Sequence, residues 1–229
     1  MEYLIELHIE QGGILDTKNL SVGVVEAIAG MRTYKIVLEG VSNHAGSTPM
    51  YLRNDPLVGA AHIIAYLEKV VKTKGLSTSV ATVGKISCEP NVPNIIPGKI
   101  EFYVDIRDVE EIGIKSVSDE LIGKVEEVAE EYGLKFSIKL LGESPAVKLS
   151  KDVIDVIEQV VKSKDYPYTS INSGAVHDSA MLVDHTKVGM IFVPSIDGKS
   201  HCPEEHTNLQ DIKLGCNVLL ESAIKLANR

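Results

Sequence analysis

The sequence predicts an α/β domain into which a smaller α+β domain is inserted. Strand-like and helical patterns alternate in a regular order between residues 31 and 141, whereas residues 1–30 and 142–229 contain short apolar strands and long amphipathic helices. The chain has 229 residues, 44% hydrophobic and 24% charged, so it can bury one good core or two modest ones. We therefore expect one domain at 31–141 and another built from the two flanking segments.

The first half of the inserted segment is expected to form a strand, a helix and a second strand. "RTYKIVLEG" has the composition of a strand. Apolar residues then recur at helical spacing and predict a helix from Pro56 to Lys74, with Asp55 before it and Gly75 after it. "STSVATVGKIS" follows as the second strand.

The second half repeats this alternation. "GKIEFYVDIR" alternates apolar and polar residues, so one face of its sheet is expected to be polar. A helix is predicted from about Ser116 to Tyr132, with Gly133 as its cap, and "LKFSIKLL" alternates as a strand. The order strand, helix, strand, strand, helix, strand is typical of a ferredoxin-like domain.

The flanking segments read as an α/β domain that lacks strands. The sequence predicts an opening strand at Leu4 to Ile9, a helix in "SKDVIDVIEQVVKSK", strands at "YTSIN" and "VGMIFVPS", and a final helix in "TNLQDIKLGCNVLLESAIKLAN". These are only about three strands, whereas sheets commonly have about five or six. We therefore expect the α/β domain to be incomplete.

The charge of the chain limits its partners. A net charge of −9 and a pI near 5.3 argue against nucleic acid or an anionic membrane, because both reward a basic surface. No apolar run is long enough to span a bilayer, and no segment resembles a signal peptide. Three irregularly spaced cysteines predict free thiols. We expect a cytoplasmic protein that acts on small molecules.

The densest group of polar residues follows the last two predicted strands. It lies in "SGAVHDSAM" and "VPSIDGKSHCPEEHTN" and contains His177, Asp178, His201, Glu204, Glu205 and His206. Such strand ends are where open α/β sheets carry their sites, although any one of these histidines taken alone is more often a capping or surface group. Cys202 beside His201 is a poor nucleophile pair, because adjacent residues of an extended segment point to opposite sides.

A second polar group lies in the inserted segment. It comprises His44 in "SNHAGSTPMYLRND", Asn94 in "NIIPG" and Arg107 on the polar strand face. Arg107 can grip a carboxylate with two parallel hydrogen bonds, and Asn94 offers both a donor and an acceptor. Together they could hold an anionic substrate. The alternative for Arg107 is a surface salt bridge with Glu101 or Asp105.

Five motifs, in order, resemble those of a known family: "ELHIEQG", "NHAGSTPMYLRNDP", "NIIPGKIEFYVDIR", "SGAVHD" and "MIFVPSIDGKSHCPEEHT". They are similar to motifs of the hydantoinase/carbamoylase branch of the zinc aminoacylase-like hydrolases. This branch includes N-carbamoyl-amino-acid hydrolases, allantoate amidohydrolases and β-ureidopropionases. Gly13 stands where proline is common, and Val176 stands where glycine is expected and should narrow the pocket beside His177.

The resemblance implies an α/β catalytic domain with two metals and an inserted ferredoxin-like lid that forms a homodimer. His8 and His201 resemble metal ligands, one for each metal, with zinc favoured over manganese or cobalt. The residues that resemble the substrate-binding set are Gln11, Asn94, Arg107, Gly174 and His177. His44 resembles a catalytic oxyanion donor that reaches the site of a neighbouring subunit.

The resemblance also implies that part of the active site is missing. In the family, the remaining ligands and the general base come from a front portion that this sequence does not match. The complete assembly is expected to hydrolyse a linear amide or ureido bond in a carboxylate substrate of the N-carbamoyl-amino-acid or allantoate type. A separate front-half polypeptide is one partner that the resemblance implies. We expect the chain alone to lack two tightly bound metals and amidase activity. The alternative is a catalytically inactive dimerising or ligand-binding remnant.

Overall fold

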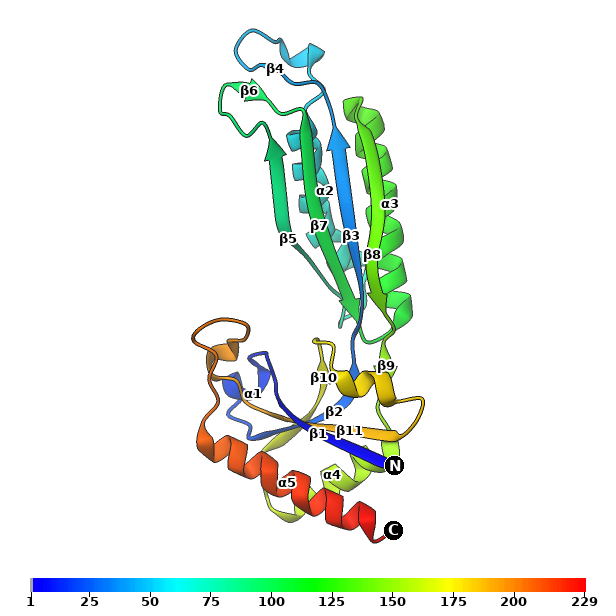
Figure 1. The fold of residues 1–229 in the computed structure, drawn as a ribbon, viewed down its shortest axis with the longest axis vertical. Coiled ribbons are helices and arrows are strands. Elements are labelled where there is room, and N and C mark those ends of the chain that lie inside the picture. Colours follow the sequence, from blue (N-terminus) through cyan, green and yellow to red (C-terminus); the bar gives the residue numbers. More distant parts are fainter. Residues whose placement is uncertain (1) are drawn as a thin grey trace. The chain divides into compact units, whose positions relative to one another are not determined.

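The computed structural model describes residues 2–229, and this part of the chain divides into two compact units (Figure 1). The first unit contains the described residues up to Ala29 together with Ala146–Arg229. The second unit is Gly30–Pro145.

The first unit is a mixed sheet with helices. Within the described residues it has five strands: β1 (Tyr3–Ile9), β2 (Val22–Ile28), β9 (Val147–Lys148), β10 (Tyr168–Ser173) and β11 (Lys187–Val193). Its helices are α1 (Ile14–Thr17), α4 (Lys151–Ser163) and α5 (Leu209–Ala227), with 3-10 turns η2 (Asp178–Leu182) and η3 (Ile196–Gly198). The order is β1-β11-β2-β10, with β9 beside β2. β1 runs parallel to β11, which runs antiparallel to β2.

The prediction of about three strands is wrong, because the sheet of the described residues has five, and β2 is the longest strand that the sequence did not reveal. Its sequence VGVVEAI is buried at every position except Glu26, because it lies between β11 and β10 and both of its faces are covered. A strand of this kind has no polar alternation, so periodicity does not reveal it. The predicted strands at the positions of β1, β10 and β11 and the helices α4 and α5 are confirmed.

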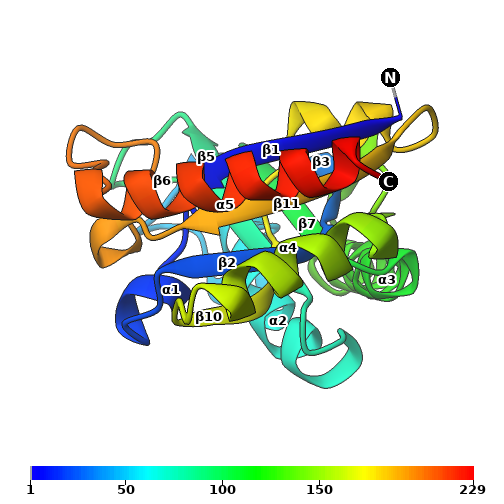
Figure 2. The same ribbon diagram turned by 90° about the horizontal axis from the view of Figure 1, so that it is seen from below.

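The core of the first unit lies on both faces of this sheet. One face packs against α4 and α5 through a cluster that includes Val24, Val156, Ile191 and Val218 (Figure 2). The other face packs against a second cluster, which includes Leu15 of α1. Gly189 of β11 allows α4 to lie close, because a Cβ there would overlap Cγ1 of Val153.

We predict that Gly189→Ala lowers the free energy of unfolding by about 1 to 2 kcal/mol, since an added methyl group overpacks this contact. Urea denaturation of the purified chain measures the change. Gly84→Ala is the matched control, because a Cβ at Gly84 meets no atom within 4 Å. Equal midpoints for Gly189→Ala and the unmodified chain would contradict the prediction.

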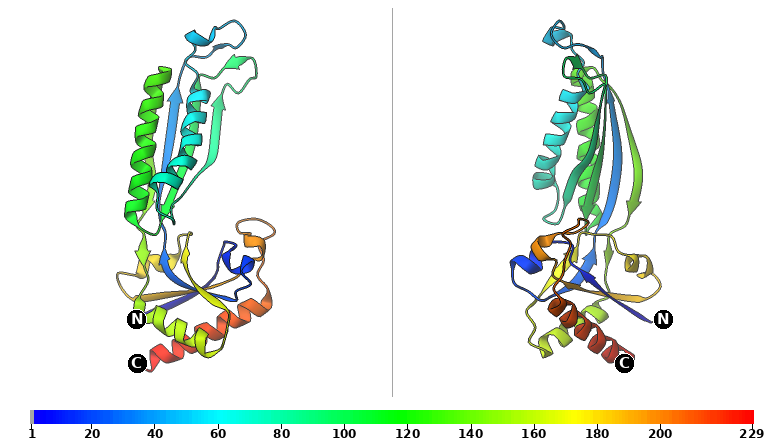
Figure 3. Two further views of the ribbon diagram at one scale, coloured as in Figure 1. Left: turned by 180° about the vertical axis from the view of Figure 1, so that it is seen from behind. Right: turned by 60° about the vertical axis from the view of Figure 1, so that its left-hand side comes forward.

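The second unit is a four-stranded antiparallel sheet, counted over the described chain, with two long helices. Its strands are β3 (Gly30–Glu39), β5 (Val80–Glu89), β7 (Lys99–Asp108) and β8 (Lys135–Ser144), and its helices are α2 (Pro56–Lys74) and α3 (Glu111–Tyr132). The sheet order is β5-β7-β3-β8. Both helices lie on one face (Figure 3). A short ribbon of β4 (Asn43–His44) and β6 (Ile95–Ile96) and the 3-10 turn η1 (Met50–Leu52) complete it.

Most elements of this unit match the sequence. Asp55 caps α2 by accepting a hydrogen bond from the Leu57 amide at 2.9 Å, and Gly133 ends α3 in the left-handed conformation. The predicted start of α3 near Ser116 is wrong by five residues, since the helix begins at Glu111. Gly113 lowers the helical propensity of this first turn, and this hid the true start.

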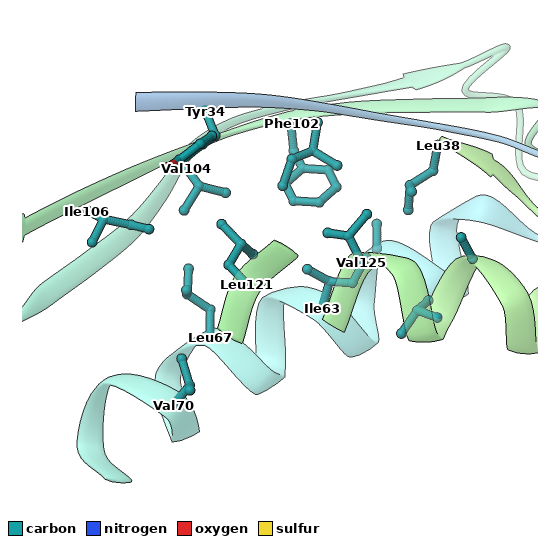
Figure 4. Packing of buried hydrophobic residues seen from close by; sticks show 14 of the residues in the cluster. Tyr34, Leu38, Ile63, Leu67, Val70, Phe102, Val104, Ile106, Leu121 and Val125 are labelled. Atoms are coloured by element: carbon teal, nitrogen blue, oxygen red, sulfur yellow. The ribbon is translucent and has the colours of Figure 1, made fainter. Parts of the chain in front are cut away.

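The core of the second unit follows the alternation of β7. Phe102, Val104 and Ile106 point toward α2 and α3 and pack against Leu67 and Leu121 (Figure 4). The intervening residues of β7 are only partly buried and polar, as expected. One face of this sheet is therefore the core, and the other presents polar side chains.

Candidate metal and substrate site

Three potential metal donors come together in the first unit. Glu6 and His8 are two residues apart on β1, so their side chains lie on the same face. His177 follows β10, and its ring meets that of His8 edge to face, with 4.6 Å between the ring centroids. One donor atom from each of the three residues lies within 4.8 Å of the others.

Hydrogen bonds leave one ring nitrogen of each histidine available. The Nδ1 of His8 lies 2.8 Å from the Ile9 carbonyl oxygen, to which it can only donate, so Nε2 keeps its lone pair. The Ser173 hydroxyl donates to the Ala175 carbonyl at 3.0 Å and accepts from the Ala175 amide at 3.2 Å. Its remaining lone pair accepts from His177 Nε2–H at 2.7 Å, which leaves Nδ1 of His177 unprotonated.

Burial favours the neutral form of His177. The residue is 6% exposed, and desolvation lowers its pKa, with a further lowering from nearby His8. Glu6 and Asp178 act in the opposite direction but do not outweigh burial. A neutral imidazole is the form that can coordinate a metal.

The donor set fits a zinc-type ion. Oε2 of Glu6 is buried and has no hydrogen-bond partner among the described residues. Such an orphaned oxygen is costly unless something satisfies it, and a cation beside two imidazole nitrogens would do so. The other ring nitrogen of His8 donates its N–H to a backbone carbonyl, as metal-ligating histidines generally do.

Gln11 and His201, in two loops of the first unit, are joined by a side-chain hydrogen bond. The Gln11 side-chain amide donates to Nε2 of His201 at 3.1 Å. Both residues have positive φ angles, 58° and 57°, which are strained for residues other than glycine and often occur at functional positions. The backbone amide of Gln11 donates a hydrogen bond to the Ser195 hydroxyl. The backbone amide of His201 donates to the Glu205 carboxylate at 3.0 Å. His201 does not belong to the Glu6–His8–His177 group in the described chain.

The glycine turn after β1 is shaped by Glu10. Its carboxylate accepts hydrogen bonds from the amides of Ile14 and Leu15, both at 2.8 Å, and so begins α1. A Cβ at Gly12 would lie 2.9 Å from Oε1 of Glu10, so glycine leaves room for this fold-back. Glu10 is therefore a structural residue, and the turn it closes positions Gln11.

The remaining loop residues are less enclosed. A Cβ at Gly174 would meet no atom within 4 Å, so this position is open. Val176 is 42% exposed. Its expected effect on a pocket beside His177 stays a prediction.

His44 and Asn94 lie together in the second unit. The pairing of β4 with β6 sets His44 opposite Ile95, and the Ala45 amide donates to the Asn94 carbonyl at 3.0 Å. Nδ1 of His44 accepts from the amides of Gly46 and Ser47, at 3.0 and 3.2 Å. In the neutral ring the proton is therefore on Nε2, which makes the exposed side of His44 a hydrogen-bond donor.

Arg107 lies toward the other end of this sheet. It pairs with Asp105, with Nε 2.6 Å from Oδ1, which is one of the two salt bridges considered as the alternative from the sequence. Lys99 begins β7, and Arg107 is eight positions further on (107 − 99), roughly 27 Å along a strand that rises about 3.4 Å per residue. Because β6 precedes Lys99, one small ligand cannot contact Arg107 and Asn94 of the same chain. Within one chain the two residues therefore cannot form the joint anion grip considered from the sequence, and their shared role in substrate binding stays a prediction.

Comparison with known proteins identifies the family. Residues 1–225 match the peptidase family M20/M25/M40. The chain belongs to this family. Among M20 relatives, it is 38% identical over 225 residues to the N-carbamoyl-L-amino-acid amidohydrolase of Pseudomonas sp. (strain NS671), and 34% identical over 223 residues to the allantoate amidohydrolase of Escherichia coli (strain K12).

Solved M20-like structures agree with this assignment. A hydantoinase/carbamoylase family amidase from Burkholderia multivorans superposes with a TM-score of 0.94 at 32% identity, over 97% of this chain and 54% of that one. The chain likewise spans 54% of the length of the Pseudomonas and Escherichia relatives while 98% and 97% of it is matched. The resemblance predicted from five sequence motifs is confirmed. No helix in residues 2–229 of this M20 chain is long and apolar enough to cross a membrane.

The sequence did not single out every residue of the candidate site. Glu6 stands in a quoted motif, and its two-residue spacing from His8 on a strand would have placed both on one face. Ser173, which orients His177, had no comparable signal, because a serine at a strand end is common. The M20 chain thus holds a donor group built from β1 and the loop after β10.

Proposed function

We propose that this M20 chain forms part of a metal-dependent amidohydrolase. Its substrate would carry a linear amide or ureido bond, as in an N-carbamoyl amino acid or allantoate. The observation that carries the proposal is the Glu6–His8–His177 donor group, in a chain similar to relatives named for these substrates. The chain spans about half the length of these relatives. The hydrolytic reaction is therefore proposed for the whole protein.

His8 would hold a metal through Nε2, with Glu6 and His177 in reach of the same position, and His201 would serve a second metal. When bound, zinc, manganese or cobalt would activate a water molecule and polarise the scissile carbonyl. Buried Ser173 would keep the ring of His177 in one orientation. The side chain of Gln11, which contacts His201, would offer its amide to the substrate.

The residues of the second unit would stabilise negative charge on the substrate. His44 would donate Nε2–H to the oxygen that becomes negative, and Asn94 beside it would add a polar contact. Arg107 would bind the substrate carboxylate in place of Asp105, with which it now pairs. Because His44 and Arg107 lie far apart in one chain, two copies would contribute them to one site. Near His44, an apolar turn is exposed at Met50 (73%), Tyr51 (85%) and Leu52 (61%). Such an exposed apolar surface supports the proposal that a second copy covers the region around His44.

A mixing experiment tests the shared site. In the complete enzyme, assayed at a substrate concentration well below the Michaelis constant, His44→Ala and Arg107→Ala are each expected to lose most of their activity. Mixed dimers should regain one unmodified site, so random exchange should restore about a quarter of the sites, since half of the dimers are hybrid and half of their sites are intact. No recovery after proven subunit exchange would show that both residues act from one chain.

The reaction itself is tested by complementation. The chain is combined with the part of the Geobacillus stearothermophilus N-carbamoyl-L-amino acid amidohydrolase that lies outside its match to this chain. Zinc and either an N-carbamoyl-L-amino acid or allantoate are added, and ammonia release is measured. We expect turnover of at least one substrate by the mixture and none by either part alone. A folded, metal-loaded mixture that hydrolyses neither would refute the proposal.

A further inference from the structure

The contact between Gln11 and His201 joins two residues whose backbones are strained. Gln11 lies in the turn after β1, His201 lies in the loop between β11 and α5, and both have left-handed backbones, with φ of 58° and 57°. For residues with a Cβ this conformation costs free energy and persists only where neighbouring groups hold it. The two side chains nevertheless meet, with 3.1 Å between their Nε2 atoms. The groups that hold these two backbones therefore decide whether the side chains can meet.

Ser195 holds the backbone of Gln11. Its hydroxyl accepts a hydrogen bond from the Gln11 amide at 3.1 Å, and the residue is fully buried just beyond the end of β11. The carbonyl of Ser195 accepts from the Gly198 amide at 2.9 Å, so both of its oxygens are used. The last backbone bond between the two strands runs from the Glu10 amide to the Val193 carbonyl. Ser195 thus takes over from strand pairing one residue later, where the backbone turns.

Glu205 holds the backbone of His201. Its Oε2 accepts hydrogen bonds from the His201 amide at 3.0 Å and from the Ser200 hydroxyl at 2.7 Å. The Glu205 amide donates to the Cys202 carbonyl at 3.1 Å, and this turn brings the carboxylate back to residues earlier in the loop. Hydrogen bonds to an ionised acceptor are stronger than those between neutral groups. One carboxylate oxygen therefore fixes the segment that carries His201.

The first part of the same loop is held against the turn after β1 by other contacts. Gly198 has a φ of 66°, and a Cβ there would lie 2.7 Å from the backbone nitrogen of Gly13, so the two backbones are closely packed. The Asp197 amide also donates to the Asp16 carboxylate at 3.0 Å. These contacts do not involve Glu205. Loss of its carboxylate should therefore free only the segment beyond Gly198 and leave the turn after β1 in place.

We propose that Glu205 and Ser195 are positioning residues for the Gln11–His201 pair. They hold the two backbones in the left-handed conformation, so that the two side chains face one another. The inference rests on the proposed function, in which His201 serves a second metal and Gln11 offers its amide to the substrate, and it adds the groups that set the distance between them. The competing role for Glu205 is that of a metal ligand beside His201, and a glutamine substitution separates the two roles.

The Gln11–His201 contact has a spectroscopic signature that needs neither metal nor turnover. Because the side-chain nitrogen of Gln11 can only donate, Nε2 of His201 accepts, and the neutral ring carries its proton on Nδ1. NMR of the chain alone at about pH 8, where an ordinary histidine is neutral, shows which ring nitrogen is protonated. A nuclear Overhauser effect between the Gln11 side-chain amide and the His201 ring reports the contact itself. We expect both signals in the unmodified chain.

Four substitutions test the two positioning residues. Glu205→Ala should abolish both signals, because the His201 amide loses its acceptor, whereas Glu205→Gln should keep them, since its carbonyl oxygen can accept the same hydrogen bonds. Glu204→Ala is the matched control, because it removes a neighbouring exposed carboxylate and should leave both signals unchanged. Ser195→Ala should abolish them from the other side, by releasing the Gln11 amide. Glu205 is exposed, so its variants should keep the fold, which the rest of each spectrum verifies.

The effect on the reaction is measured after the unmatched part of the Geobacillus stearothermophilus relative is added. Glu205→Ala should lower kcat/KM by about ten- to 100-fold, the range for losing a group that orients a metal ligand. Glu205→Gln should stay close to the unmodified chain, because it keeps the acceptor. A glutamine variant as impaired as the alanine variant would show that the carboxylate itself is needed, as a metal ligand is, and would overturn the positioning role.

Two further results would overturn the inference. One is that Glu205→Ala retains the Gln11–His201 signals, or that the unmodified chain lacks them. The other is that the signals disappear in Glu205→Ala while kcat/KM of an active mixture is unchanged. The NMR measurements do not depend on catalysis, so an inactive mixture would refute the proposed reaction while the spectra still decide whether Glu205 and Ser195 position the pair.

Discussion

His8→Ala is expected to lower the affinity of this chain for a divalent metal by at least about 100-fold. Loss of a hydrogen-bonded neighbour of a metal ligand typically costs about ten- to 100-fold, and loss of the ligand itself should cost more. The Nε2 lone pair of His8 is available to a metal, since Nδ1 of the same ring donates to the Ile9 carbonyl. Glu6 and His177 would remain, but two donors hold zinc poorly.

Cobalt titration followed by absorbance, or zinc titration followed by calorimetry, measures this effect on the chain by itself. We expect the unmodified chain to bind one ion weakly at the Glu6–His8–His177 group, and two tightly bound ions only after the part of the Geobacillus stearothermophilus relative outside its match to this chain is added. His185→Ala is the control, because His185 is an exposed histidine of the same unit. An equal loss of metal affinity in the His8 and His185 variants, or no loss in either, would show that β1 carries no metal site.

The sequence revealed the elements whose patterns are periodic. α2 carries its start and stop signals at Asp55 and Gly75, and the strict alternation of β7 predicts which face points inward. β2 escaped because a strand buried on both faces has no alternation. The short β4–β6 ribbon escaped because each of its strands has only two residues, too few for any period.

The site was visible in the sequence as residue types and motifs, but its contacts depend on tertiary structure. The approach of His177 to His8 is set by the order of β1, β11, β2 and β10, which no local pattern encodes. The separation of Asn94 from Arg107 follows from the length of β7 and the position of β6. Chemistry suggested that these two residues act together, whereas the sheet holds them apart within one chain.

Arg107→Ala is expected to raise the Michaelis constant of the complete enzyme by about ten- to 150-fold, which corresponds to about 1.5 to 3 kcal/mol for hydrogen bonds to a charged group. The guanidinium can present two parallel N–H donors to the substrate carboxylate, and alanine removes both. The turnover number should change less, because the carboxylate is bound alike in the ground state and the transition state.

Asp105 provides the sharpest comparison for this prediction. Its carboxylate now occupies the donors of Arg107, with the closest contact at 2.6 Å, so a substrate carboxylate would have to compete with it. Asp105→Asn should therefore leave the Michaelis constant unchanged or lower it, because the competing charge is gone while Arg107 remains. Arg32→Ala is the control, since Arg32 pairs with Glu111 and Glu143. If Arg107→Ala leaves the Michaelis constant unchanged, or if Asp105→Asn raises it as much, then the Arg107–Asp105 pair is a structural salt bridge and the carboxylate binds elsewhere.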